Sequence, residues 1–259
     1  MKNDFFKPIK IIIKNSLGKF GLQISRINSK IRYPVEFTKR DIEIFNYVYE
    51  RNLTMIGKQR MFSNILIAKW ITQNELEGDF VECGVWRGGS TLLVKMIFEE
   101  YGNNSKVWLF DTFKGMTQPT DVDINFSGEL AKVKYLKSKK TDYVDWAYAG
   151  YKDVKDNFIR SGVKIDDCVF VKGDVLKTIP RYNDKLKKIS FLRLDTDWYE
   201  STKIELDYFY PKIVKDGFLV IDDYGHWGGS RKAADQYFHK NQINEFKNMI
   251  DSSSRMIRK

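Results

Sequence analysis

Residues 78–91 decide the fold and read Gly78-Asp-Phe-Val-Glu-Cys-Gly-Val-Trp-Arg-Gly-Gly-Ser-Thr91. The stretch opens with the apolar pair Phe80-Val81, which is typical of a buried strand. It then turns through glycines and enters the apolar run Leu92-Leu93-Val94. A strand, a glycine turn and a helix start, in that order, favour a site for a nucleotide-like ligand, because free N–H groups at the helix start point at the ligand.

The spacing of the glycines and one acidic residue narrow the ligand class. Gly84, Gly88 and Gly89 give Gly-x-x-x-Gly-Gly, so the usual dinucleotide pattern Gly-x-Gly-x-x-Gly is missing. Glu82 stands two residues before the first glycine. A carboxylate there would repel a pyrophosphate and would suit a ligand with a positive charge, such as an amino acid or a sulfonium. The alternative is an ordinary strand-to-helix turn with a solvated Glu82.

Length and composition indicate a globular protein with a sizeable core. The chain has 259 residues, 42% of them hydrophobic and 30% charged, which fits one large α/β domain or two small ones. Cys83 and Cys168 are too few for a disulfide framework or a cysteine-based zinc site. No apolar run approaches the ~18 residues of a membrane span, and lysines interrupt the N-terminal apolar residues too often for a secretory signal. We therefore expect a cytoplasmic protein.

The formal net charge of +10 is concentrated at the N-terminus. Residues 1–32 carry eight Lys and Arg residues against Asp4 alone, a net charge of +7. Apolar residues interleave with the lysines at roughly helical spacing, which predicts a basic N-terminal helical arm over residues 1–51. Such a helix suits the surface of an anionic membrane. Alternatively it packs on the rest of the chain or on a second subunit, and we expect a homo-oligomer.

Strands alternate with helices through residues 52–259. The sequence predicts strands near residues 80–81, 106–110, 169–173, 191–194 and 218–221, and an edge strand within 249–257. Helical patterns lie between them, which predicts a mostly parallel sheet covered on both faces. Residues 117–150 hold no strong strand but are polar and rich in aromatic residues. We interpret this insertion as a lid or substrate-binding segment. The alternative, a surface excursion without a role in binding, fits the same sequence features equally well.

Acidic residues follow several of the predicted strands. Asp111 ends the second strand and is placed to accept both hydroxyls of a ribose, or alternatively to cap a helix. Asp174 ends the third strand and is placed to meet an adenine amino group. Two further pairs, Asp195 with Asp197 and Asp222 with Asp223, end the fourth and fifth strands.

These two pairs predict a metal site. Parallel neighbours end at the same edge of a sheet, so the four carboxylates of Asp195, Asp197, Asp222 and Asp223 converge there and repel one another unless a cation lies among them. Oxygen ligands alone favour a hard ion, Mg²⁺ or Ca²⁺. The alternative is that two of the four cap helices instead.

Four motifs together resemble the macrocin O-methyltransferase family. They read Val-Glu-Cys-Gly-Val-Trp-Arg-Gly-Gly-Ser, Phe-Asp-Thr-Phe-Lys-Gly-Met, Leu-Arg-Leu-Asp-Thr-Asp-Trp-Tyr-Glu-Ser-Thr and Ile-Asp-Asp-Tyr-Gly, in this order between about residues 52 and 239. The resemblance implies a Rossmann-like class I methyltransferase with a mostly parallel seven-stranded sheet. It also implies two cofactors, S-adenosylmethionine and Mg²⁺, and methylation of a sugar hydroxyl in a glycan, a sugar nucleotide or a glycosylated natural product.

The resemblance also implies roles for single residues. Glu82 and the Gly84 loop would hold the methionine end of the cofactor, Met55 would close over it, Asp111 would bind the ribose, and Asp174 with Val175 the adenine. Ser90, Phe113 and Gly115 lie in the same motifs and belong to the implied cofactor site. Asp195, Asp222 and Asp223 would bind Mg²⁺, with Asp197 as the base. The loop at Met55 reads Thr-Met-Ile-Gly where the family usually has Thr-Met-Thr-Ser.

The expected reaction is an in-line displacement in which a sugar alkoxide attacks the sulfonium methyl group. Mg²⁺ would bind two neighbouring hydroxyls of the acceptor and lower the pKa of one. His226, just after the second aspartate pair, is the alternative base. Two other classes stay open: a methyltransferase for another small molecule or a nucleic acid, and a non-enzymatic binding module on the same fold. We expect no nucleic-acid partner, because the chain has no adjacent proline pair and its basic excess is confined to the arm.

Overall fold

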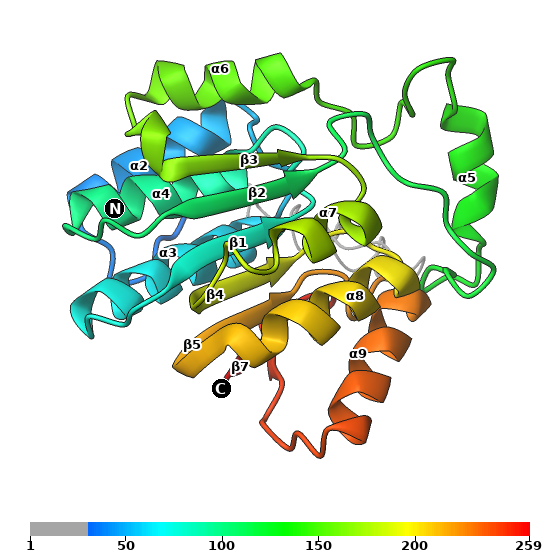
Figure 1. Cartoon of the computed structure of the whole chain (residues 1–259). Helices are drawn as coiled ribbons and strands as arrows, with labels where there is room; N and C mark the ends of the chain where they lie inside the picture. The colour runs from blue at the N-terminus through cyan, green and yellow to red at the C-terminus, as the bar shows by residue number, and fades with distance from the viewer. Residues whose placement is uncertain (1–30) are drawn as a thin grey trace, which may run out of the picture. The chain divides into compact units, whose positions relative to one another are not determined.

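The computed structural model describes residues 31–259, and residues 35–259 form one compact unit. Its centre is a seven-stranded sheet in the order β3-β2-β1-β4-β5-β7-β6 (Figure 1). The strands, in chain order, are β1 (Asp79–Cys83), β2 (Val107–Asp111), β3 (Cys168–Lys172), β4 (Ile189–Leu194), β5 (Ile213–Ile221), β6 (Asn248–Met249) and β7 (Arg255–Arg258). The first five pair in parallel, while β7 pairs antiparallel with β5 and with β6. This confirms the predicted mostly parallel, seven-stranded α/β fold.

The two central strands form the core because both of their faces are covered. All six residues of β4 are buried, and so are four of the five residues of β1. Phe80 of β1 packs against Phe191 of β4 with ring centroids 4.8 Å apart. Nearly continuous apolar runs of this kind are what a parallel sheet covered by helices requires.

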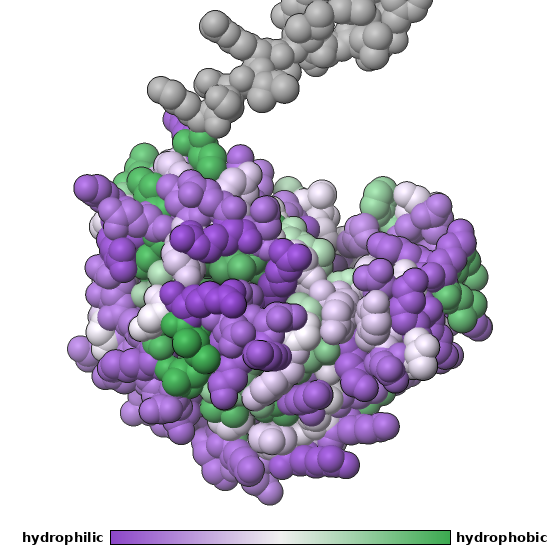
Figure 2. All heavy atoms as spheres, turned by 90° about the horizontal axis from the view of Figure 1, so that it is seen from above, coloured by the Kyte–Doolittle hydropathy of each residue, from purple (hydrophilic) through white to green (hydrophobic). Residues whose placement is uncertain are grey.

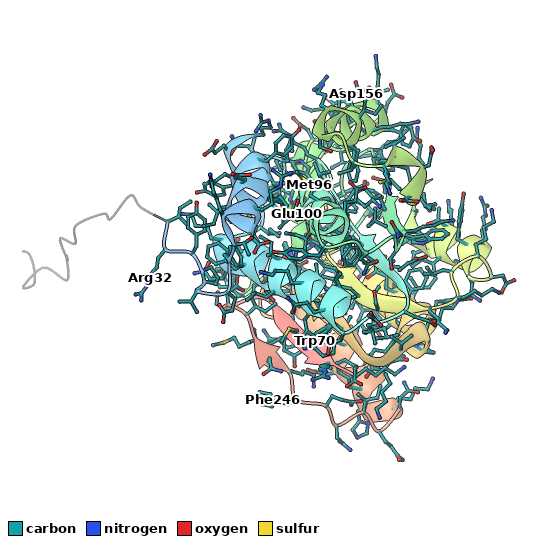
Figure 3. The ribbon with its side chains drawn as sticks, turned by 90° about the vertical axis from the view of Figure 1, so that its left-hand side faces the viewer. Arg32, Trp70, Met96, Glu100, Asp156 and Phe246 are labelled. Carbon is teal, nitrogen blue, oxygen red and sulfur yellow. The ribbon has the colours of Figure 1, made fainter. Side chains whose placement is uncertain are left out.

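Helices cover both faces of the sheet (Figure 1). One layer holds α2 (Lys39–Glu50), α3 (Lys58–Gln73), α4 (Gly89–Glu100) and α6 (Tyr151–Ser161), and the other holds α7 (Val175–Tyr182), α8 (Tyr199–Phe209) and α9 (Gly228–Lys240). Two 3₁₀ turns, Ile165–Asp167 and Tyr210–Lys212, precede β3 and β5. Figure 3 views the end at which the parallel strands begin, where Trp70 of α3 packs edge-on against Phe218 of β5 at 5.3 Å.

The N-terminal part of the predicted arm, residues 1–30, lies outside the described residues. Its last part is α2, which begins at a capping box formed by Thr38 and Asp41, as the sequence pattern predicts. The helix packs against α4, and the side chain of Asp41 accepts hydrogen bonds from Lys69 and Tyr101. Although α2 lies within the predicted arm, before residue 52, it belongs to the same compact unit as the sheet. Among the described residues, no helix is long and apolar enough to cross a membrane.

The insertion, residues 117–150, forms a lobe beside the carboxyl ends of the strands and carries α5 (Ala131–Ser138) (Figure 1). It is tied to the domain at its base. The buried carboxylate of Asp123 accepts hydrogen bonds from the backbone N–H of Tyr199, at the start of α8, and from the backbone N–H of Thr120. The indole of Trp146 packs against Trp198 and Trp227, with centroids 5.5 and 6.0 Å away. The insertion therefore has a fixed base of its own beside the strand ends.

Candidate active site

The glycine turn after β1 lies against the loop after β4, where the strand order reverses. Gly84 has φ +81°, and a Cβ atom there would overlap the backbone carbonyl oxygen of Asp195. Glycine is required at this position both by the left-handed backbone and by the contact between the two loops. Ligands of open α/β sheets bind in the crevice that such a reversal opens.

Asp111 organises this crevice. One of its carboxylate oxygens accepts hydrogen bonds from the backbone N–H groups of Val85 (2.8 Å) and Trp86 (3.3 Å), and the other accepts one from Phe113 (2.6 Å). Burial raises the pKa of Asp111, and these hydrogen bonds oppose that rise. The side chain thus holds the glycine turn in place while it lines a cavity with Gly84, as the ribose prediction requires.

The other predicted cofactor residues divide into two groups. Met55, Gly115 and Val175 line the same cavity as Asp111, and Met55 with Ser90 and Glu82 lines a second one. Two residues differ from the prediction. The side chain of Phe113 is buried edge-on against the ring of Tyr151, 5.2 Å away, and lines neither cavity. Asp174 caps α7 by accepting a hydrogen bond from the N–H of Leu176, and lines a groove outside both cavities.

Glu82 is neutralised from within the protein. Its buried carboxylate pairs with Arg193 Nη1 at 2.6 Å and accepts a hydrogen bond from the hydroxyl of Thr91. Burial raises the pKa of Glu82 to about 7, and the charge of Arg193 opposes the rise. The alternative reading of a solvated Glu82 is therefore wrong. The negative charge of Glu82 is nevertheless already paired with the positive charge of Arg193 on the neighbouring strand β4.

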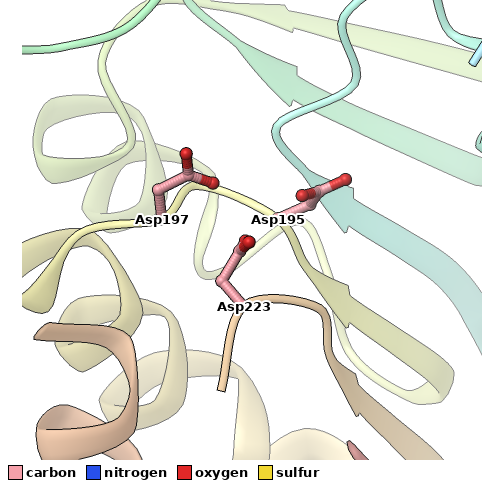
Figure 4. A group of neighbouring side chains, drawn as sticks. All are labelled: Asp195, Asp197 and Asp223. Carbon is pink, nitrogen blue, oxygen red and sulfur yellow. The ribbon is translucent and has the colours of Figure 1, made fainter. Parts of the chain in front are cut away.

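Three carboxylates gather where β4 and β5 end (Figure 4). Oxygens of Asp195, Asp197 and Asp223 all lie within 4.8 Å of one another. Burial raises the pKa of Asp197 to about 7 and that of Asp223 well above its usual value, and in Asp223 the neighbouring aspartates add to the rise. Asp223 Oδ2 is buried and has no hydrogen-bond partner within residues 31–259. Crowded oxygen ligands and an unpartnered buried carboxylate oxygen fit a hard divalent cation.

The predicted metal set differs from this cluster in one member. Asp222 has its two oxygens on two guanidinium groups, those of Arg60 and Arg193, and Asp197 takes its place beside Asp195 and Asp223. The pKa of Asp222 is raised to about 6 by burial, against the opposing charges of both arginines. Asp222 and Asp223 are adjacent, so their side chains leave the chain in different directions and meet different neighbours.

Sequence reasoning missed both arginines. Arg193 is fully buried inside β4, two residues before Asp195, and contacts Glu82, Asp195 and Asp222. A lone arginine inside an otherwise apolar strand is the signal that would have identified it, because a buried charge requires partners. Arg60, in the first turn of α3, carries no comparable signal.

His226 lies in the loop that follows the cluster and lines the second cavity. Its imidazole is half-buried between Phe126, 5.3 Å away, and Trp227, 5.0 Å away. Burial and the charges of Arg60 and Lys134 lower its pKa, so the ring is neutral at pH 7. A neutral imidazole is able to accept a proton.

Two cavities meet at the aspartates. The first contains Gly84, Asp111 and Val175; the second, of about 410 Å³, contains Arg60, Asp223 and His226. Five of the described residues line both: Met55, Trp86, Trp146, Asp195 and Asp197. Trp86 and Asp197 hold left-handed backbone conformations, which concentrate at functional sites. Figure 2 shows a hollow between the body of the domain and the lobe of the insertion.

Known proteins of similar fold are methyltransferases. The chain matches a solved structure described as the O-methyltransferase NovP with a TM-score of 0.68 and 27% identity, over 80% of this chain and 81% of that one. Together with the sheet order and the crevice, this places the chain among class I methyltransferase folds.

The family follows from the sequence comparisons. The model of the family macrocin-O-methyltransferase (TylF) matches residues 29–259, so the chain belongs to this family. It is 31% identical to mycinamicin III 3''-O-methyltransferase of Micromonospora griseorubida over 66% of its length. It is 28% identical to a tetracenomycin-C rhamnosyl 4'-O-methyltransferase of Streptomyces olivaceus, again over 66%. The matched regions span 65% and 62% of these relatives, less than two thirds of their length.

Proposed function

We propose that this protein transfers a methyl group from S-adenosylmethionine to a hydroxyl group of a sugar. The observation that carries the proposal is the junction of two cavities at one carboxylate cluster, since Asp195 and Asp197 line both. A methyl donor in one cavity and an acceptor in the other would meet at this junction. Membership of the macrocin-O-methyltransferase family supports the same reaction.

The first cavity fits the donor. Asp111 supplies a partly buried carboxylate for the ribose hydroxyls, and Gly84 and Gly115 lie in the wall of the same cavity. Val175 supplies an apolar wall suited to the adenine. Glu82 and Ser90 line the second cavity near the junction, where the methionine end of the donor would lie.

The cluster of Asp195, Asp197 and Asp223 would hold Mg²⁺. When bound, this ion would act as a Lewis acid that orients acceptor hydroxyls and lowers the pKa of one. The two arginines nearby cannot replace it, since Arg60 and Arg193 are engaged by Glu82, Asp195, Asp222 and Asp251. Among the described residues around this site, the carboxylates thus outnumber the arginines that pair with them.

His226 would take the proton of the acceptor hydroxyl. Its neutral ring lines the acceptor cavity, whereas Asp197, the base implied by the family resemblance, lies within the cluster and would be engaged as a ligand. Trp146, from the base of the insertion, lines both cavities and would exclude water from the junction. An acceptor with neighbouring hydroxyls suits this arrangement.

The rest of the chain would serve location and assembly. The predicted membrane contact of the basic arm and the predicted homo-oligomer rest on residues 1–32, nearly all of which lie outside the described part of the chain. Both remain predictions.

Release of S-adenosylhomocysteine in the presence of a panel of glycosides and sugar nucleotides tests the proposal. We expect release that depends on a sugar acceptor and falls at least about 100-fold in His226→Ala, as removal of a general base commonly produces. Asp197→Asn should instead weaken the response to Mg²⁺. Binding of S-adenosylmethionine without transfer to any hydroxyl acceptor would contradict the proposal.

A further inference from the structure

A third cavity, of about 770 Å³, lies beside the two active-site cavities and has no part in the reaction described above. Its walls come from the end of α2, the loop before α4, the residues just before α6 and one side of α6 from its first turn to its last. The residues that characterise it are Tyr47, Arg51, Arg87, Tyr148, Asp153 and Arg160. Three arginines from three separate elements therefore face one space, with a single carboxylate among the described residues that line it.

Two of these arginines are held in place without neutralisation. The guanidinium of Arg51 lies over the ring of Tyr47 at 4.1 Å and donates to the carbonyl oxygen of Tyr47. That of Arg87 lies over the indole of Trp86 at 4.6 Å and donates to the carbonyl oxygen of Asn52. Within residues 31–259, neither forms an ion pair with a carboxylate. Stacking and single hydrogen bonds leave most of each planar donor set available.

Arg160 adds a third charge. Its nearest carboxylate, that of Asp156 one turn earlier in α6, is 3.9 Å away, and the arginine side chain is 72% exposed, so this pair neutralises it weakly. Asn157 donates a hydrogen bond to the backbone carbonyl of Arg87 and thereby fixes α6 against the loop that carries Arg87. The cavity thus keeps an excess of positive charge in a stable frame.

The position of the cavity connects it with the acceptor. Leu53, Arg87 and Tyr148 line it, and each lies within two residues of a side chain shared by both active-site cavities, namely Met55, Trp86 and Trp146. A ligand that extends past these three residues from the acceptor cavity would reach the arginines.

We propose that this cavity binds the phosphate or diphosphate group of the acceptor, so that the substrate is a sugar carried on a diphosphate. The proposal rests on the proposed function and deepens it. The planar guanidinium group of an arginine donates two parallel hydrogen bonds to two oxygens of one phosphate. The rings of Tyr47 and Tyr148 offer an aromatic surface for the group attached beyond the phosphate. The carrier is a nucleoside or a lipid, since both present the same diphosphate. The N-terminal arm is itself basic and does not fit this cavity by charge.

Binding is tested first without any acceptor. Inorganic pyrophosphate is titrated by calorimetry into the full chain saturated with S-adenosylhomocysteine, in buffer with EDTA, so that neither the donor site nor a metal takes up the probe. We expect Arg51→Gln/Arg87→Gln/Arg160→Gln to weaken pyrophosphate binding at least tenfold. The matched control, Lys152→Gln/Lys155→Gln/Lys164→Gln, removes three exposed charges outside the cavity and should change it less than twofold. No binding by the wild type, or equal loss in both variants, would overturn the proposal.

Kinetics then separates this proposal from the proposed function. Methyl transfer is measured with a nucleoside-diphosphate sugar, a lipid-diphosphate sugar and a neutral methyl glycoside. A preference for either diphosphate, with KM raised at least tenfold and kcat changed less than threefold in the arginine variant, supports the anion site and identifies the carrier. Use of the neutral glycoside as efficiently as both diphosphate sugars by the wild type, with KM for the diphosphate sugars unchanged in the arginine variant, would overturn the anion site and leave the methyltransferase proposal standing. Failure of all three acceptors would count against the proposed function, while the pyrophosphate titration still decides the cavity.

Discussion

Asp222 and Asp223 are neighbours at the end of β5, yet they belong to two different environments. Asp222 belongs to an arginine network, in which Arg60 and Arg193 engage Glu82, Asp222 and Asp251. Asp223 belongs to the cluster with Asp195 and Asp197, and one of its oxygens has no hydrogen-bond partner among the described residues. Of the residues that the structure describes, Asp195 alone contacts both groups. The carboxylate of Asp222 is thus paired with arginines and stabilises the fold, whereas those of Asp197 and Asp223 form no ion pair within residues 31–259 and are available to a cation.

The largest expected effect is a loss of folding stability when the arginine network around Asp222 is broken. Asp222→Asn leaves two largely buried arginines short of a counter-charge, and breaking a buried ion pair costs roughly 3–5 kcal/mol. Urea unfolding should show a loss of this size. Asp207→Asn, which removes an exposed pair with Lys203, should cost only about 0–1 kcal/mol. Similar values for the two variants would mean that the network does not stabilise the fold.

Asp223→Asn should have the opposite effects: turnover is lost while the stability of the fold is kept. Removing one of three crowded carboxylates relieves repulsion, so the metal-free protein should be at least as stable as the wild type. Turnover should fall by at least about 100-fold, because a metal contributes several kcal/mol to such a step. Affinity for S-adenosylmethionine should stay within about twofold. A large loss of stability in this variant would erase the distinction between Asp222 and Asp223.

Asp111 tests the cavity proposed to hold the methyl donor. Asp111→Asn replaces a charged acceptor of the ribose hydroxyls by a neutral one, at a cost of about 1.5–3 kcal/mol in binding. Calorimetry should show S-adenosylmethionine affinity lowered by one to two orders of magnitude. Unchanged affinity would limit Asp111 to its role in holding the glycine turn.

The smallest expected effect is that of the Asp41–Lys69 ion pair, which lies away from the candidate active site, on the free energy of unfolding. Burial would raise the pKa of Asp41, but hydrogen bonds from Lys69, the backbone of Thr38 and Tyr101 outweigh it and lower the pKa. The folded state then binds this proton less tightly than the unfolded state, so the contribution is present above about pH 4 and lost on acidification through the lowered pKa. Asp41→Asn should cost about 1.5 kcal/mol at pH 7 and nearly nothing at pH 2. A cost that does not depend on pH would show that charge plays no part.

Much of the fold follows from patterns within single segments. Apolar runs such as Phe218–Ile221 predict buried parallel strands, and Thr38 with Asp41 predicts the start of α2, because both signals depend on neighbours in sequence. The convergence of Asp195 and Asp223 was likewise predictable, since parallel strands end at one edge.

The partners of buried charges were not predictable in the same way. Which of Asp222 and Asp223 meets an arginine depends on Arg60, contributed by α3 more than 150 residues earlier, and on side-chain direction at a strand end. The inward packing of Phe113 depends on Tyr151 of α6, beyond the insertion. The third cavity is likewise assembled from three distant segments.

The central claim is that the clustered carboxylates of Asp195, Asp197 and Asp223 hold a divalent ion needed for methyl transfer. The most direct measurement is turnover of the wild-type protein with a sugar acceptor in EDTA, followed by titration with Mg²⁺. We predict that activity is lost in EDTA, returns with Mg²⁺ in the wild type and does not return in Asp223→Asn. Full activity of the wild type in EDTA would contradict the account.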